Sequence, residues 1–222
     1  MKPMALTRPL FLISLLWASP VLSADELPEY DPYNAEDINE MCAACHGMNG
    51  QGGGGGVYPR LAGLPQEYLA TQIKNFKERK RHNIPMLPFA NDRELPPEDV
   101  RDITTYLSQI KLESQMPKQT GHMDGYARLK QLELIVQIPR LEGDLENGED
   151  YYMEMCRGCH NVDGKGRGTK PAIAGQYSRY IAKQIKDYRE GRRVHIDQEE
   201  LFGEMTQDDI TDVLAFLSIQ DD

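Results

Sequence analysis

The feature that most constrains this chain is a five-residue motif, C-x-x-C-H, which occurs twice. The first copy is Cys42-Ala43-Ala44-Cys45-His46 and the second is Cys156-Arg157-Gly158-Cys159-His160. Together the two copies use all four cysteines of the chain. A thioredoxin-like redox pair is also C-x-x-C, but a histidine directly after it is the signature of c-type haem attachment. The doubled motif therefore predicts two haem groups, each bound covalently.

The spacing within the motif suits haem chemistry. Two thiols about one helical turn apart can add to the two vinyl groups of one porphyrin, and the next residue then lies beneath the iron. A tetrahedral zinc site would have to draw on both motifs or on further histidines, yet the chain has five histidines and no H-x(3–5)-H pair. Zinc and disulfides are the alternatives. The predicted thioether residues are Cys42, Cys45, Cys156 and Cys159, and the predicted axial ligands are His46 and His160.

The two halves of the chain repeat one another beyond the motif. The motifs are 114 residues apart, and Pro59 and Pro171, which follow them, are 112 apart. We expect each proline to place its carbonyl oxygen near the second ring nitrogen of the axial histidine and so fix the ring orientation. Apolar residues recur at helical spacing and β alternation is missing, so the fold class is all-α, with two tandem domains around one haem each. Helices are expected at 35–45, 66–80 and 98–107, and again at 149–159, 178–190 and 208–217.

The N-terminus predicts export. Lys2 and Arg8 precede a short apolar run over residues 10–17, and small residues follow at Ser23-Ala24, which is typical of a secretory signal peptide. A retained anchor is the alternative. We therefore expect a mature protein in the periplasm without stable membrane insertion. The formal charge of −10 argues against nucleic acid and anionic lipid as partners. We divide the chain into a signal peptide (1–24), a first domain (25–110), a linker (111–147) and a second domain (148–222).

The sixth ligands of the two irons are expected to differ. Met86 lies between two prolines before the closing helix of the first half, and a thioether suits a low-spin haem iron. In the second half the equivalent position is Gln198 or Ile196, depending on the alignment offset, and neither is a good ligand. His195 is one residue from the second of these positions and is the preferred ligand. Met205 and an open site are the alternatives.

The motifs at 42–46 and 156–160, the Pro-x-Leu/Ile-x-Gly segments and Met86 before a closing helix resemble class I cytochromes c. The tandem arrangement is similar to a di-haem cytochrome of the c4 type, over about residues 34–110 and 148–220. The resemblance implies two packed helical domains and electron transfer in the periplasm. Members of that type carry a methionine ligand in both halves, and this chain lacks it in the second. The linker is also long, and residues 126–138 could form an amphipathic helix that covers the domain interface or a haem edge. A partner-docking element is the alternative.

These observations favour an electron carrier over an enzyme. With both irons six-coordinate, neither would bind a substrate. Methionine ligation raises the potential of the first haem, so electrons would enter at the second and leave from the first. They would pass from a donor dehydrogenase or quinol-oxidising complex to a terminal oxidase or reductase. The acidic chain would bind redox partners through basic docking surfaces on those partners. The alternative is a di-haem oxidoreductase with catalysis at the second haem.

Overall fold

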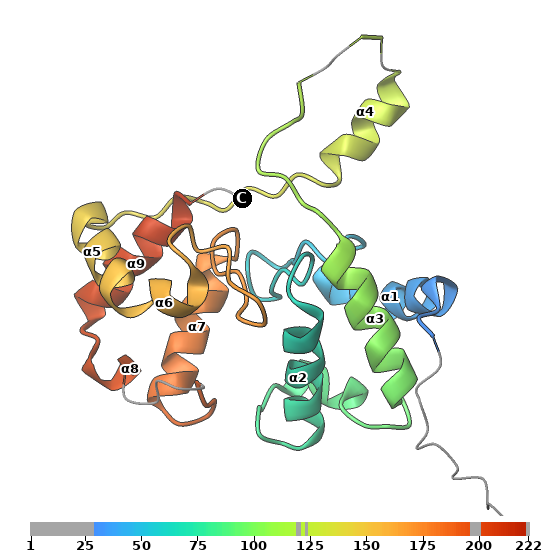
Figure 1. Cartoon of the computed structure of the whole chain (residues 1–222), viewed down its shortest axis with the longest axis horizontal. Coiled ribbons are helices and arrows are strands. Elements are labelled where there is room, and N and C mark those ends of the chain that lie inside the picture. Colours follow the sequence, from blue (N-terminus) through green and yellow to red (C-terminus); the bar gives the residue numbers. More distant parts are fainter. Residues whose placement is uncertain (1–28, 119–120, 123, 196–200, 221–222) are drawn as a thin grey trace, which may run out of the picture.

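The computed structural model describes residues 29–118, 121–122, 124–195 and 201–220, and the predicted signal peptide lies outside them. Two helical lobes stand side by side, the blue-to-green part of the chain forming one and the gold-to-red part the other (Figure 1). In the described part of the chain, β structure is limited to isolated bridges. The predicted all-α fold with two tandem domains is therefore confirmed. None of the described helices is long and apolar enough to cross a membrane.

The first domain is arranged around the contact of its first and last helices. Its elements are α1 (Pro32–His46), α2 (Gln66–Lys77), the 3-10 helix η1 (Ile84–Phe89) and α3 (Pro97–Gln109). The helix α3 packs against both α1 and α2. Their apolar faces meet in a buried cluster that excludes water and stabilises the domain. Its members are Ile38, Leu64, Leu69, Leu95, Ile103 and Leu107.

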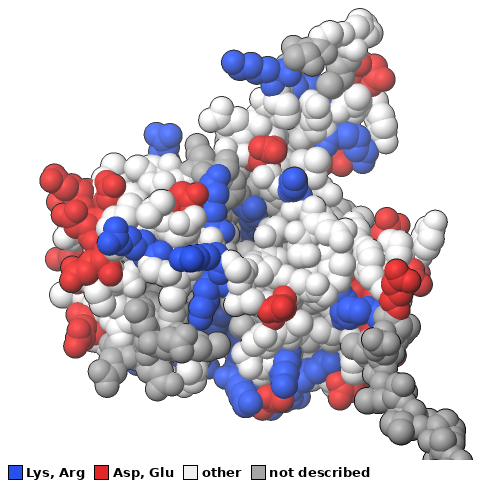
Figure 2. Space-filling model, viewed as in Figure 1, with Lys and Arg blue, Asp and Glu red and all other residues white. Residues whose placement is uncertain are grey.

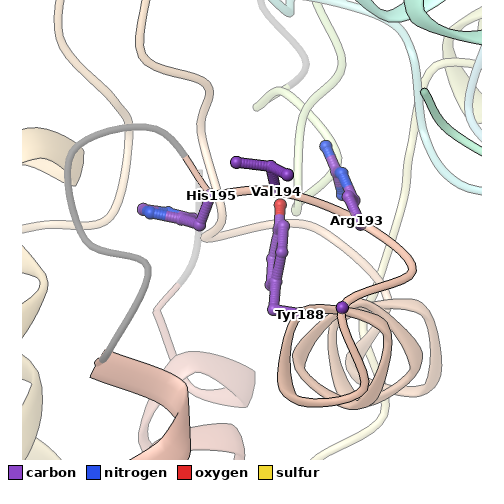
Figure 3. A pocket seen from close by; sticks show the side chains of 5 residues that line it. Tyr188, Arg193, Val194 and His195 are labelled. Atoms are coloured by element: carbon purple, nitrogen blue, oxygen red, sulfur yellow. The ribbon is translucent and has the colours of Figure 1, made fainter.

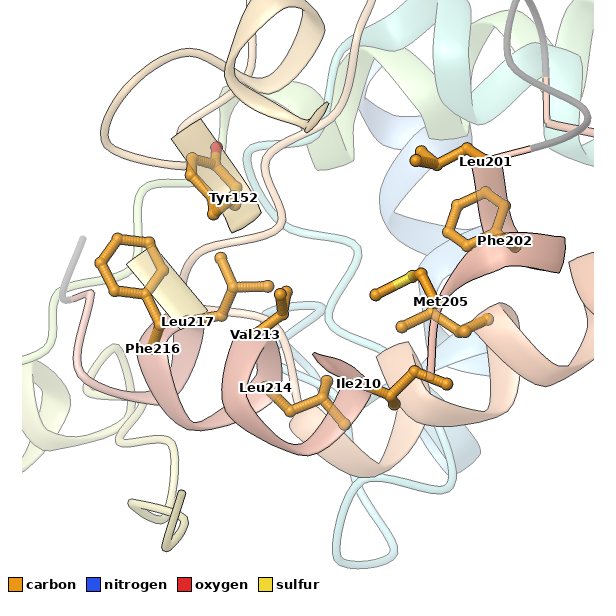
Figure 4. Close-up of a cluster of buried hydrophobic side chains, with 10 residues drawn as sticks. Tyr152, Leu201, Phe202, Met205, Ile210, Val213, Leu214, Phe216 and Leu217 are labelled. Atoms are coloured by element: carbon orange, nitrogen blue, oxygen red, sulfur yellow. The ribbon is translucent and has the colours of Figure 1, made fainter. Parts of the chain in front are cut away.

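The second domain repeats this arrangement. Its elements are α5 (Leu145–Met155), α6 (Arg157–His160), α7 (Ser178–Arg189), α8 (Leu201–Glu204) and α9 (Gln207–Ser218), with α5 and α9 in close contact. Figure 4 shows the buried cluster that the closing helix α9 builds with residues of α5, α7 and α8. Its members are Tyr152, Ile185, Leu201, Phe202, Met205, Ile210, Val213, Leu214, Phe216 and Leu217.

A buried aspartate ties the start of the first helix of each domain to the last helix. In the first domain Asp102, which is 1% exposed, accepts hydrogen bonds from the backbone N–H of Asp31 at 3.2 Å and from the side-chain amide of Asn34 at 3.0 Å. Asp31 is also the N-cap of α1. The second domain repeats the contact, with Asp212 accepting from the N–H of Asp144 at 2.8 Å and the amide of Asn147 at 2.7 Å.

Replacing Asp102 with asparagine should lower the free energy of unfolding by about 1–3 kcal/mol at neutral pH, because buried donors lose a charged acceptor. Burial raises the pKa of Asp102, but hydrogen bonds from Asn34 and Arg101 outweigh burial and hold this pKa below its ordinary value. Such a carboxyl stabilises the fold above its unfolded pKa of about 3.9, and this stability is lost as the pH falls through the folded value.

Urea unfolding of wild type and Asp102→Asn should therefore differ fully at about pH 7 and progressively less below about pH 4. The exposed Asp37, which lies in α1, provides the control variant Asp37→Asn. A stability difference that persists undiminished at about pH 3 would contradict the role given to the ionised carboxylate.

Part of the linker projects as an arm (Figure 1), whereas its residues Leu134, Val136 and Ile138 pack in one cluster with Ala62 of the first domain and Tyr177 of the second, as expected of a cover for the domain interface. Its helix α4 (Gly125–Leu132) ends six residues before the end of the expected helix at 126–138. The helix is shorter than expected because residues after α4 pair with Glu113, which donates its N–H to Leu134 and accepts one from Val136. Tyr126, at 70% exposed, and the neighbouring leucines of α4 stay open to solvent.

The two domains meet at a polar seam near their Pro-x-Leu/Ile-x-Gly segments. The side-chain oxygen of Gln176 accepts the backbone N–H of Arg60 at 3.0 Å, and its amide donates to the Arg60 carbonyl at 2.9 Å. The Arg60 guanidinium also donates to the carbonyl of Gly175 at 3.3 Å. All these contacts join residues more than a hundred positions apart, so they fix one domain against the other.

Candidate haem sites

Both C-x-x-C-H motifs lie at the end of the first helix of their domain. The helix α1 runs to His46, and Gly47, with φ of 77°, ends it. In the second domain α5 ends at Met155 and the short helix α6 continues to His160. Burial raises the pKa of the first thiol of each motif, Cys42 and Cys156, to about 11. A redox-active thiol needs a lowered pKa, because the thiolate is the nucleophile, so these pairs do not resemble a thioredoxin site.

The axial histidines are oriented as an iron ligand requires. The Nδ1 atom of His46 lies 2.9 Å from the carbonyl oxygen of Pro59, and Nδ1 of His160 lies 2.8 Å from that of Pro171. A carbonyl only accepts, so Nδ1 carries the proton and Nε2 presents its lone pair. Burial lowers the pKa of both rings, which favours the neutral form that binds metal. The expected proline contacts are confirmed, and the residues present fit a haem iron.

Met86 lies in the 3-10 helix η1, between α2 and α3. Pro85 and Pro88 flank it, and its N–H donates to the carbonyl of Asn83 at 3.0 Å. This short element contacts α2, and the Met86 side chain is half-buried. Its ligation of the first iron stays a prediction.

His195 faces the axial histidine of the second domain. The ring centroids of His160 and His195 are 6.3 Å apart, with the planes at 50°. A metal bound at about 2 Å from a ring nitrogen lies about 3 Å from the ring centroid, so two rings on opposite sides of one ion are about 6 Å apart. Tyr188 and Phe202 each meet His195 edge-on at 5.1 Å. Figure 3 shows His195 and Arg193 pointing to opposite sides of Tyr188.

The other candidates for the second iron occupy different surroundings. Met205 is 4% exposed and packs with Phe202 and Ile210 in the hydrophobic cluster of the second domain (Figure 4). Ile196 and Gln198 lie outside the described residues. The structure therefore brings His160 and His195 together, while the assignment of His195 as a ligand stays a prediction.

Sequence reasoning missed a set of polar side chains between the domains, which we call the arginine lattice. Its members are Tyr68, Gln72 and Arg81 of the first domain and Tyr180, Gln184 and Arg193 of the second. The Arg81 guanidinium donates to Gln72 Oε1 in its own domain at 2.9 Å. Across the seam it donates to the Tyr180 hydroxyl at 2.7 Å and to Gln184 Oε1 at 3.1 Å.

Arg193 makes the reciprocal contacts. Its guanidinium donates to Gln184 in its own domain at 2.7 Å, and across the seam to the Tyr68 hydroxyl and Gln72 Oε1, both at 3.0 Å. Equivalent members lie 112 residues apart, as do Pro59 and Pro171. That shared offset was the signal in the sequence, but each arginine directly follows another basic residue, as in a solvent-exposed basic segment.

The comparison with known families decides what these sites are. A family model described as cytochrome c matches residues 36–111 and again residues 145–220. The chain belongs to the cytochrome c family. It is a di-haem class I cytochrome of the c4 type, with two haem c groups bound covalently at Cys42/Cys45 and Cys156/Cys159.

Relatives of this cytochrome carry electrons. It is 35% identical over 182 residues to a thiosulfate dehydrogenase electron acceptor of Thiomonas intermedia, covering 81% of this chain and 73% of that one. It is 31% identical over 157 residues to cytochrome c4 of Pseudomonas aeruginosa, covering 70% and 69%. These similarities make the chain an electron-transfer protein.

Solved structures share its fold. Reduced cytochrome c4 from Pseudomonas stutzeri aligns with a TM-score of 0.63 at 23% identity, over 86% of this chain and 98% of that one. The thiosulfate dehydrogenase TsdBA from Marichromatium purpuratum aligns with a TM-score of 0.65 at 23% identity, over 86% of this chain. This cytochrome spans only 40% of the TsdBA chain.

Proposed function

We propose that this cytochrome is a periplasmic electron carrier in which both irons are six-coordinate. The first iron would be held by His46 and Met86, and the second by His160 and His195. The observation that carries the proposal is the 6.3 Å separation of the His160 and His195 rings, which suits two ligands on one iron. A closed distal side leaves no position for a substrate, so the second domain relays electrons instead of catalysing a reaction.

The ligand asymmetry gives the carrier a direction. Bound haem supplies the one-electron change between ferric and ferrous iron. A methionine sulfur favours the reduced iron and raises its potential, whereas a second imidazole leaves the potential lower. Electrons would therefore enter at the second domain and leave from the first, passing from a dehydrogenase or quinol-oxidising complex to a terminal oxidase or reductase.

The relatives suggest which donor to test first. One relative is named a thiosulfate dehydrogenase electron acceptor, and another with the same name, from Stutzerimonas stutzeri, is 27% identical over 92% of this chain. We propose a sulfur-compound dehydrogenase, with thiosulfate as the first substrate class to try, as the electron donor.

The second domain carries an acidic surface on which a donor could dock. Acidic side chains gather at the outer edge of this domain, over α5 (Figure 2). The exposed acidic residues of this helix are Glu146, Glu149, Asp150 and Glu154. A donor with a basic docking surface would be steered toward this edge, and salt would weaken the attraction.

Stopped-flow reduction by a thiosulfate dehydrogenase tests the proposal. We expect the second haem to be reduced first, and the Glu149→Lys/Asp150→Lys variant to be reduced severalfold more slowly at low salt. The matched control is Glu36→Lys/Asp37→Lys, which reverses two exposed charges on α1 of the first domain. Reduction of the first haem before the second, or equal slowing by both variants, would overturn the direction. Rapid cyanide binding to the wild-type second haem would favour the oxidoreductase alternative.

A further inference from the structure

The helix α4 on the projecting arm has one face that stays open to solvent. Its inner face is tied to the other limb of the arm, because the Arg128 guanidinium donates to the carbonyl of Pro117 at 2.9 Å. Its outer face carries Tyr126, Leu129 and Leu132, which are 70%, 54% and 49% exposed. None of the buried clusters formed by the described residues includes these three side chains.

The three exposed side chains form one continuous surface. They recur at every third position of α4, so consecutive members are neighbours on the helix. The helix that presents them is capped, with Asp124 accepting the N–H of Ala127 at 2.7 Å. Single exposed apolar residues are common in soluble proteins, but a contiguous apolar surface on a projecting element is typical of an interaction site.

The charge of this surface is balanced, whereas the chain as a whole has a formal charge of −10. The charged side chains of residues 124–133 are Asp124, Arg128, Lys130 and Glu133, two of each sign, so their formal charges cancel. Lys130 lies 2.9 Å from the Glu133 carboxylate and 5.9 Å from the centroid of the Tyr126 ring. Figure 2 shows both signs of charge on the arm. An apolar surface bordered by one cation and one anion is complementary to a copy of itself.

We propose that the outer face of α4 binds the same face of a second copy of this chain, forming a weak dimer with a two-fold axis. Antiparallel pairing of the two helices brings the apolar side chains of both copies together, and neither copy presents a net charge at the contact. The arm projects from the body of the molecule (Figure 1), so it is where two acidic chains can touch with least repulsion. Its three apolar side chains offer less than the about 800 Å² per partner of a stable interface, so we expect a dissociating dimer.

This dimer would join the two chains on the side of the first haem site. The amide of Asn49 donates to the carbonyl of Glu133 at 3.1 Å, and Asn49 lies three positions after the axial His46. The helix α5 lies at the opposite end of the molecule from α4 (Figure 1). Its acidic side chains therefore stay free for a donor, and the inference is independent of the direction of electron flow.

Sedimentation equilibrium of the di-haem protein, followed by haem absorbance from about 1 μM to about 1 mM, tests this. We expect a monomer–dimer equilibrium in the wild type, and dimerisation at least about tenfold weaker in Leu129→Ser/Leu132→Ser. Higher salt should strengthen the wild-type dimer, because it screens the repulsion between the two acidic bodies. Leu129→Cys should form a disulfide-linked dimer under mild oxidation, since identical positions meet at a two-fold axis.

The matched control is Leu141→Ser/Leu145→Ser, which replaces two leucines of similar exposure, 41% and 42%, at and just before the start of α5. It should leave the dimer unchanged, and both double variants should keep the visible spectrum of the wild type. A wild type that stays monomeric, equal weakening by both double variants, or a dimer that weakens as salt rises would each overturn the proposal. Binding to phosphatidylcholine vesicles in place of dimerisation, lost in Leu129→Ser/Leu132→Ser, would assign this face to lipid instead.

Discussion

In the His195→Ala variant, the second haem should become five-coordinate and bind carbon monoxide, while the first haem stays closed. Among the described residues, the rings of Tyr188 and Phe202 surround His195, so removing the imidazole should leave the distal position of the second iron open. Carbon monoxide should then change the Soret absorbance of one haem out of two in the reduced variant. Added imidazole should restore the six-coordinate spectrum.

Met205, the alternative ligand of the second iron, provides the control for this prediction. Met205→Leu conserves side-chain volume within the buried cluster and should leave the spectrum unchanged. A spectrum that changes in Met205→Leu and not in His195→Ala would assign the second iron to Met205. Rapid carbon monoxide binding by the wild type would instead show that the second site is open.

Replacing Met86 with histidine should lower the potential of the first haem by a sizeable fraction of the about 0.8 V range that axial ligands cover. Imidazole donates more electron density to ferric iron than a thioether does, so the oxidised state gains stability. The long-wavelength charge-transfer band of methionine-ligated ferric haem should disappear at the same time. Redox titration followed by visible spectroscopy measures both changes.

Met48 provides the control for the Met86 prediction. It lies beside the first haem motif and is 59% exposed, so Met48→Leu should keep both the potential and the band. Persistence of the band in Met86→His would show that another residue binds the first iron. In the wild type, the charge-transfer band should have the intensity of one methionine-ligated haem. An intensity equal to that of two such haems would contradict His195 as the ligand of the second iron.

Local patterns predicted the parts of the structure that depend on neighbours in sequence. The two motifs, the prolines that orient His46 and His160, and the helical classification all follow from short spacings. The expected linker helix at 126–138 was too long, because the pairing of residues 134 and 136 with Glu113 depends on a contact across more than twenty positions. Periodicity alone does not reveal such a competing partner.

The interface could not be predicted for a similar reason. Arg81 follows Lys80, and Arg193 follows Arg192, so each resembles the end of a solvated basic run. Only the packing of one domain on the other buries Arg193 and turns both side chains toward the opposite half. The buried aspartates Asp102 and Asp212 were likewise hidden, because an acidic residue in a helix is usually on its surface.

The reciprocal contacts of Arg81 and Arg193 have the form of a two-fold symmetric dimer interface, yet they lie within one polypeptide. In a true homodimer, any substitution appears on both sides of the axis and changes both sites equally. Joining the two copies in one chain removes that restriction. One copy can then keep Met86 while the other acquires a histidine near the same place, with the shared interface preserved. Covalent fusion therefore allows the two copies of one redox domain to carry different residues at their haem sites.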